Sequence, residues 1–444
     1  MGTSYVTFYD ISIAVIWLII FLIISNSRRK AIEDLDVRKY YLRNVLFKFF
    51  FSISFAIVYL IYYGGGDTTA YWDGALTLNN LFLKSPSMYF EHLFSEPTKN
   101  LLSAHFDIDT GYPPGWIYRE PEAWFICKLG SLVSFFTLKS YFAASLFFAF
   151  FSAMASWRIF ELILKLNTHK KNVAAWCILF IPSVSFWCTG ISKDTIVFIC
   201  ILNILYYVFD FMVLKNNLSV KKVIILLICM YLIYQVRSFI LAAITLPLFM
   251  SYGARLTRKY ERNFIAKLFL RSLILFGGIF LFLQFFASEF ANNMVNEAQV
   301  VQQDFIQNDI YTGKRYEISN TDASPQGLLR AVPESVFYGI FRPYFWESLT
   351  PNLFLNGLES LILMFLAIKF VLNRNVFSRL KKIRKEEILV FAFIFSLFIA
   401  FVAGFTSVLF GVLVRIRAPL LLFLFLVLTF QITTSERTEN IEKQ

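Results

Sequence analysis

The chain has 444 residues, of which 57% are hydrophobic, and 53 of them are Phe. A soluble domain of this length could not bury so much apolar surface in one core, which excludes an ordinary globular enzyme. The formal net charge is +12, but Lys and Arg are spread over short segments between apolar blocks. This distribution is typical of membrane topology and does not support nucleic acid as a partner. Composition therefore predicts an all-α polytopic membrane protein.

The apolar blocks have the length of about 17 to 25 residues that a helix needs to cross the hydrocarbon core. The first block has neither a basic n-region nor a cleavage site of small residues, so we expect it to be retained as a helix. The eleven expected spans are 11–27, 45–63, 141–165, 172–190, 194–214, 222–236, 238–254, 267–287, 353–373, 387–405 and 415–432.

Basic residues are concentrated in every second connection, beginning with the segment 28–43. The positive-inside rule makes these connections cytoplasmic, which predicts an outside N-terminus and a cytoplasmic tail at 433–444. We expect one membrane domain, 1–444, with two long external loops at 64–140 and 288–352. Long loops of this kind tend to be functional.

The segment 115–137 is apolar enough to be a twelfth span, but it contains Arg119, Glu120, Glu122 and Lys128. Charges are costly at the middle of a membrane. An extra span would also move a cytoplasmic lysine pair to the outside. We therefore expect an amphipathic helix that lies along the outer interface, entered through the turn Tyr112-Pro113-Pro114.

The first external loop opens with Gly64-Gly65-Gly66-Asp67-Thr68-Thr69-Ala70-Tyr71. Three glycines release the chain from the second span and allow the backbone to approach a ligand closely. Asp67 follows at the membrane surface, where a carboxylate is suitably placed to act as a general base. The alternative is that Asp67 only caps the helix that starts at Thr68. The sequence favours neither reading.

Further along, Asp107 and Asp109 are candidates to bind a metal or a sugar, although solvated loop carboxylates are commoner.

Several Lys and Arg residues lie in predicted external positions, where the positive-inside rule does not expect basic residues. Lys193 and Asp194 occupy a short external turn, with a helix start as the alternative explanation. The other outward cations are Arg237, Arg342, Arg415 and Arg417. Such a cluster suits a phosphate or pyrophosphate group, while ion pairs with Asp67, Asp194 or Glu347 are a compatible alternative.

The five Cys lie in or beside apolar segments, and the three His do not cluster along the chain. Buried thiols are expected rather than disulfides or a zinc site. The sequence contains no P-loop, dinucleotide fingerprint, zinc-protease or serine-hydrolase motif. No cofactor follows from the sequence, and a requirement for a divalent metal is left open.

The segment 45–210 resembles the GT-C superfamily of multi-spanning glycosyltransferases, which use polyprenyl-phosphate-linked sugars. The similar pieces are Asp67 in its glycine-rich context, Tyr112-Pro113-Pro114 before an interfacial helix, and the stretch from Ile181-Pro182-Ser183 to Lys193-Asp194. The resemblance implies that Asp67 is the catalytic base, that external cations hold the lipid phosphate, and that the enzyme resides in a bacterial inner membrane. Two features depart from the family: a second acid comes only at Asp73, and no large soluble C-terminal domain follows.

The partners implied are the bilayer, a lipid-linked sugar donor and a glycan, lipid or protein acceptor. The candidate contacts to substrate or acceptor are Tyr71, Asp73, Asp107, Asp109, Tyr112, Asp194 and Glu347. Two alternatives remain. One is a polysaccharide repeat-unit polymerase or ligase that uses the same carrier. The other is a transporter of lipid-linked glycans, which would place its polar groups nearer the midplane.

Overall fold

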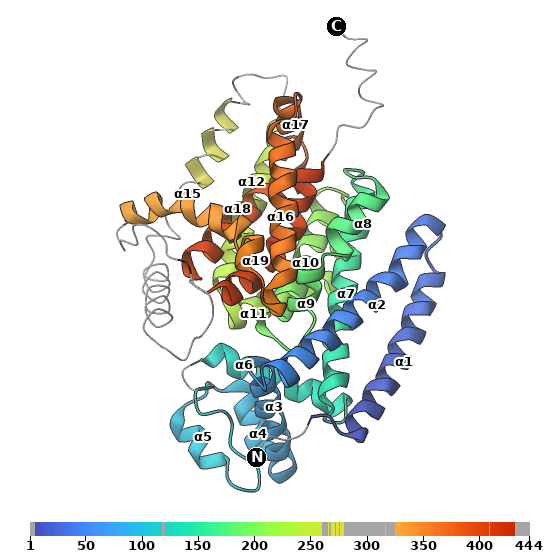
Figure 1. Cartoon of the computed structure of the whole chain (residues 1–444), viewed down its shortest axis with the longest axis vertical. Helices are drawn as coiled ribbons and strands as arrows, with labels where there is room; N and C mark the ends of the chain where they lie inside the picture. The colour runs from blue at the N-terminus through green and yellow to red at the C-terminus, as the bar shows by residue number, and fades with distance from the viewer. Residues whose placement is uncertain are drawn as a thin grey trace. The chain divides into compact units, whose positions relative to one another are not determined.

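The computed structural model describes residues 5–117, 120–259, 325–407 and 409–430, together with Tyr316 and part of 265–278. Every regular element among these residues is a helix, as the composition predicts (Figure 1). The chain divides into two compact units. Unit 1 comprises Met1–Leu162 and Ile178–Ile240, and unit 2 comprises Ile163–Cys177 and Leu241–Gln444.

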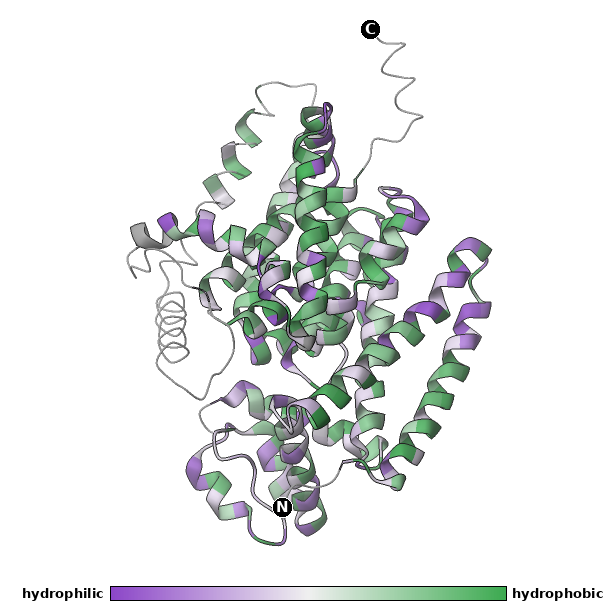
Figure 2. Ribbon diagram, in the orientation of Figure 1, coloured by the Kyte–Doolittle hydropathy of each residue, from purple (hydrophilic) through white to green (hydrophobic). Residues whose placement is uncertain are grey.

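Eight described helices are long and apolar enough to cross a membrane, and Figure 2 shows hydrophobic colours over most of the length of these helices. Each coincides with a predicted span, which indicates a multi-pass membrane protein. The eight are Phe8–Lys30, Leu35–Tyr62, Tyr141–Lys165, Lys193–Met212, Phe239–Thr257, Leu353–Val371, Glu387–Thr406 and Phe410–Thr429. The total of eleven spans remains a prediction.

The three other predicted spans differ from these eight. The segment 172–190 consists of two short helices, α8 (Lys171–Leu179) and α9 (Pro182–Trp187), because Pro182 cannot continue the hydrogen-bond pattern of α8. The segment 222–236 is helix α11 (Val220–Arg237), which carries basic residues at both ends. The segment 267–287 lies largely outside the described residues.

In unit 1, helix α2 (Leu35–Ile57) turns a polar face toward its neighbours, α7 (Tyr141–Lys165) and α9. Asn44, Lys48 and Ser52 follow one another at helical spacing, and all three are completely buried. The Asn44 amide donates to the carbonyl oxygen of Ala153 at 2.9 Å, and the Ser52 hydroxyl donates to the carbonyl oxygen of Ser145 at 3.0 Å. Hydrogen bonds to main-chain oxygens therefore compensate for burying polar side chains in an apolar bundle.

The segment 64–140, predicted as the first external loop, folds into four helices within unit 1, which gather beside one another in Figure 1: α3 (Asp67–Lys84), α4 (Pro86–Phe94), α5 (Lys99–His105) and α6 (Pro121–Phe136). Helix α6 occupies the predicted interfacial segment, but it begins at Pro121 and not directly after Pro113-Pro114. Its buried face packs on α3, where Gly74 lies against Cys127 and Gly130 against Ala75. Contact of α6 with the membrane surface stays a prediction.

Unit 2 contains α12 (Phe239–Lys259), α15 (Pro325–Phe341), the short 3₁₀ turn Phe345–Glu347, α16 (Pro351–Val371), α17 (Val376–Ile383), α18 (Glu387–Thr406) and α19 (Phe410–Thr429). Helices α15 and α18 approach closely through two glycines. A Cβ on Gly339 would lie 2.0 Å from the carbonyl oxygen of Ala400, and one on Gly404 would lie 1.9 Å from that of Ser335. Small residues permit such backbone contact between helices.

Candidate functional site

Asp67 is the first residue of α3, and its side chain is exposed. The three preceding glycines have φ angles of +65°, +136° and +146°, a conformation that other residues rarely adopt. Gly66, not Asp67, occupies the N-cap position, and the amide of Gly66 donates to the hydroxyl of Thr69 at 2.9 Å. The simple capping explanation for Asp67 is therefore wrong. Its carboxylate faces solvent in the first turn, where the helix dipole favours the anion.

The other candidates on α3 differ in exposure. Tyr71 is buried, with its ring 6.3 Å from that of Trp116. Asp73 is exposed and accepts a hydrogen bond of 2.5 Å from the hydroxyl of Tyr5. Tyr112, in the connection that leads toward α6, is also exposed. Tyr71 thus belongs to the packing of the loop, whereas Asp73 and Tyr112 lie at the surface.

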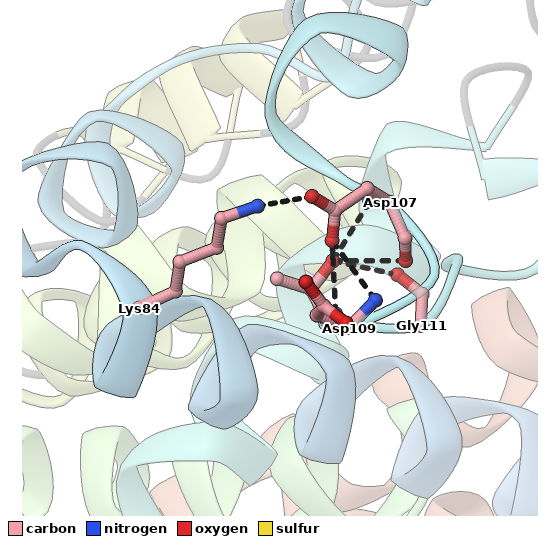
Figure 3. A network of polar contacts seen from close by, with 5 residues as sticks. Lys84, Asp107, Asp109 and Gly111 are labelled. Carbon is pink, nitrogen blue, oxygen red and sulfur yellow. Dashed lines mark hydrogen bonds and ion pairs between the residues drawn. The ribbon is translucent and has the colours of Figure 1, made fainter.

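Asp107 and Asp109 form a tight turn that is tied to α3 (Figure 3). One carboxylate oxygen of Asp107 accepts from the amides of Asp109 and Thr110, both at 3.1 Å, and the other is bonded to the ammonium of Lys84. These contacts, the bond from Lys84 above all, lower the pKa of Asp107 to about 2. Asp107 therefore stabilises the loop, and Asp109 is the more exposed of the two carboxylates.

Lys193 joins the first-loop helices to the core of unit 1. It is the first residue of α10 (Lys193–Met212), whose N-cap is Ser192. Its ammonium lies 3.2 Å from a carboxylate oxygen of Glu120 and 3.2 Å from one of Glu122, at the start of α6. The Lys193 side chain retains 12% of its exposure. An incoming phosphate would have to share this cation with two carboxylates.

Asp194 and Arg237 form a buried ion pair between α10 and the last residue of α11. The guanidinium nitrogen of Arg237 lies 2.7 Å from a carboxylate oxygen of Asp194, whose side chain is 2% exposed. Pairing of an outward cation with Asp194 was one of the two readings of the sequence, and this pair confirms it. Breaking a buried pair by removing one partner typically costs about 3–5 kcal/mol.

The remaining predicted cations belong to unit 2. Arg342 lies 3.8 Å from Glu347, measured between a guanidinium nitrogen and a carboxylate oxygen. Arg417 is completely buried and donates to the carbonyl oxygens of Ile340, Arg342 and Asn356 at 3.3, 2.5 and 3.2 Å. Helix α19 begins at Phe410, so Arg415 and Arg417 lie inside it and not at its start. The terminal nitrogens of Arg417 are therefore engaged by main-chain oxygens.

Lys48 was not singled out in the sequence, because it is a lone cation within an apolar block. It is completely buried in α2, and its ammonium donates to the hydroxyl of Ser185 in α9 at 3.0 Å. The Phe198 ring centroid lies 5.5 Å away. No carboxylate forms an ion pair with Lys48 within the described part of the chain. An ionisable side chain inside a span is itself the signal that would have identified it.

The histidines are closer together than the sequence suggests. His92 in α4 and His105 at the end of α5 lie 3.2 Å apart between ring nitrogens, and His105 is 3.9 Å from Glu91. The expectation that the histidines do not associate is therefore wrong for this pair, because the fold of the loop brings α4 and α5 together. Among the described residues, no set of three His, Cys, Asp or Glu could hold a metal ion. All five Cys are buried thiols, as expected.

The geometry thus joins Asp194 with Arg237, Lys193 with two acids of the first loop, and Arg342 with Glu347. Asp67, Asp73, Asp109 and Tyr112 stay exposed on the first loop. Comparison with models of protein families, with curated proteins and with solved structures gave no match, so no relative assigns a role to any of these residues.

Proposed function

We propose that this protein is a membrane glycosyltransferase that moves a sugar from a polyprenyl-phosphate-linked donor to an acceptor hydroxyl at the outer membrane surface. The observation that favours this most is the ion-paired connection between the first loop and the helical core. Lys193 at the start of α10 binds Glu120 and Glu122, and the same loop carries Asp67 directly after the second span. The resemblance to GT-C enzymes supports the same assignment.

In the proposed reaction, the Asp67 carboxylate accepts the proton of the acceptor hydroxyl, and the hydroxyl oxygen attacks the anomeric carbon of the sugar. The bond from that carbon to the phosphate oxygen breaks with inversion, and the polyprenyl phosphate departs as an anion. A cation beside the departing oxygen stabilises the developing charge. Lys193 suits this role because its side chain is partly exposed, whereas the buried pair of Arg237 and Asp194 holds α10 and α11 together.

Replacement of the base tests this mechanism. Asp67→Asn removes the proton acceptor but keeps the size of the side chain, so we expect transfer to fall about 10²- to 10⁴-fold. Turnover is measured in proteoliposomes with a radiolabelled lipid-linked sugar. Asp36→Asn, at the start of α2, is the matched control and should leave the rate unchanged. Wild-type turnover by Asp67→Asn would remove this residue from the mechanism.

The same assay separates a transferase from a polymerase. Addition of a single sugar indicates a transferase, and a ladder of products indicates a repeat-unit polymerase or ligase.

Transport is the second candidate function, and Lys48 is the observation that favours it. Transporters often bind substrate at interrupted helices inside the membrane. Here the predicted span 172–190 is interrupted at Pro182, and Ser185 of α9 binds the buried Lys48. Movement of a lipid-linked glycan across proteoliposomes without covalent change would establish transport and rule out the transferase.

A further inference from the structure

Arg342 is held in a cage of aromatic rings in unit 2. It directly follows the last residue of α15, and its side chain is 19% exposed. The guanidinium carbon lies 4.1 Å from the ring centroid of Tyr338, 5.4 Å from that of Tyr316 and 5.5 Å from that of Tyr344. Contact with aromatic rings fixes the position of a guanidinium group and leaves its N–H groups, which lie in its own plane, available to a ligand.

The guanidinium of Arg342 donates no hydrogen bond to any residue that the structure describes. Its Nε is buried without an acceptor. The nearest carboxylate, Glu347, is 3.8 Å away, and the other oxygen of Glu347 accepts from the Tyr344 amide at 2.8 Å. The Arg342 side chain is partly exposed, so its terminal N–H groups can reach a ligand, while a buried N–H such as that of Nε normally has an acceptor.

Arg417 provides an internal comparison. It lies next to Arg342 and is also buried, but it donates to three carbonyl oxygens, including that of Arg342 itself at 2.5 Å. Both arginines have a buried Nε without an acceptor. They differ at the terminal nitrogens, which bind carbonyl oxygens in Arg417 and donate to no described residue in Arg342. Arg417 acts as a positioning residue, since it fixes the main chain from which the Arg342 side chain extends.

The surroundings of Arg342 indicate what carries its ligand. Trp346 stacks on Tyr344, with ring centroids 5.0 Å apart, and remains 63% exposed. Leu349, three residues further, is 65% exposed. An exposed Trp with Tyr and a cation beside it is typical of the membrane–water interface, where lipid phosphates reside.

We propose that Arg342, Tyr316, Tyr338 and Tyr344 form an oxyanion site for the phosphate group of an anionic lipid, with Trp346 against the lipid chain. A planar guanidinium can donate two parallel hydrogen bonds to two phosphate oxygens. Glu347 weakens the site without neutralising it, because its carboxylate is also engaged by Tyr344. The site is independent of the proposed transfer reaction, since a lipid phosphate would bind here whether the protein transfers sugar or not.

The test measures lipid and phosphate binding to the full-length protein in nanodiscs. One arm compares phosphatidylcholine discs with and without polyprenyl phosphate, and the other titrates inorganic pyrophosphate. We expect Arg342→Gln to weaken lipid binding about 10- to 100-fold, the effect of losing hydrogen bonds to a charged group. Arg342→Lys should lose part of this, because it keeps the charge but not the planar donors. Arg330→Gln, on an exposed position of α15, is the matched control and should bind as wild type.

A second variant avoids the risk that Arg342→Gln does not fold. Trp346 is exposed, so Trp346→Ala should fold normally, weaken lipid binding and leave pyrophosphate binding unchanged. Binding of pyrophosphate alone, with no response to the lipid, would replace the lipid with a water-soluble phosphate as the ligand. Unchanged lipid binding by both Arg342→Gln and Trp346→Ala, or equal losses in Arg330→Gln, would overturn the site.

Discussion

Lys48 illustrates how single buried cations are accommodated in this protein. Its ammonium has one hydroxyl acceptor, Ser185, and an aromatic neighbour, Phe198. A buried charge without an oppositely charged partner costs several kcal/mol, so Lys48 is destabilising wherever it stays protonated. Arg417 differs, because three carbonyl oxygens surround its guanidinium. A residue that is kept at such a cost is a functional candidate.

Lys48→Met should therefore leave the protein as stable as the wild type or stabilise it by about 1–4 kcal/mol, since Met fills a similar volume without a charge. Ser185→Ala should instead destabilise it by about 1–3 kcal/mol, because the ammonium loses its acceptor. Thermal unfolding in detergent measures both. In the double variant Lys48→Met/Ser185→Ala, the loss of stability that Ser185→Ala causes in the wild type should largely disappear. A large loss of stability in Lys48→Met alone would show that the ion contributes favourably.

At the scale of elements, the segment 64–140, predicted to be external, is a packed helical body rather than an irregular connection. Helix α6 lies on α3 through small residues, and Tyr89 of α4 hydrogen-bonds to Ser131 of α6 at 3.0 Å. The turn at Asp107 is bound to α3 through Lys84. These contacts hold the start of α3, and with it Asp67, in one orientation.

The contact between α3 and α6 can be tested at Gly74. A Cβ on Gly74 would lie 2.6 Å from the sulfur of Cys127, so Gly74→Ala should destabilise the loop by about 1–3 kcal/mol through overpacking. Cys127→Ala in the same protein removes the sulfur and should recover most of this loss. Gly115→Ala is the control, because no atom lies within 4 Å of its added Cβ. Protease resistance of the loop reports the effect, and equal resistance of all three variants would contradict the packing.

The pair of His92 and His105 predicts a pH dependence of the same loop. Burial, with smaller effects of His105 and Lys128, lowers the pKa of His92 from 6.5 to about 4. Between these values the unfolded chain binds a proton that the folded loop does not, so stability falls as the pH drops from 6.5 toward 4. The loss amounts to about 3 kcal/mol at the acidic end.

Hydrogen exchange of α4 and α5 at pH 7 and pH 5 checks this expectation. We expect faster opening at pH 5 in the wild type, after correction for intrinsic exchange, and no such difference in His92→Phe. The amides of α10 serve as the internal reference. An acid-induced opening that persists in His92→Phe would assign the effect to another group.

At the scale of the whole molecule, the eight long apolar helices found among the described residues indicate a multi-pass membrane protein. The orientation follows only from charge, through the positive-inside rule. The five native Cys are buried, which makes single-cysteine labelling practicable.

We therefore expect Asn100→Cys, in α5 of the first loop, to react with a membrane-impermeant maleimide added outside intact cells. Ser378→Cys, in α17, should react only after the membrane is permeabilised. Both positions are exposed, so accessibility within the protein does not limit either reaction. The opposite pattern would invert the topology and place Asp67 in the cytoplasm.

The sequence by itself determined the helical class and the position of most spans, because apolar length and charge placement act locally along the chain. It also predicted the pairing of a cation with Asp194, which the structure shows, and singled out Asp67, whose role stays a prediction. Only the tertiary structure decided which cations already have ion-pair or hydrogen-bond partners within the protein. The sequence does not distinguish Lys48, Arg342 and Arg417, but Lys48 binds Ser185, Arg417 binds the carbonyl oxygen of Asn356, and Arg342 contacts the ring of Tyr316, all from other segments of the chain. Partners that are distant in the sequence decide whether a cation forms an ion pair, binds carbonyl oxygens or can bind a ligand. A local sequence pattern does not include these partners.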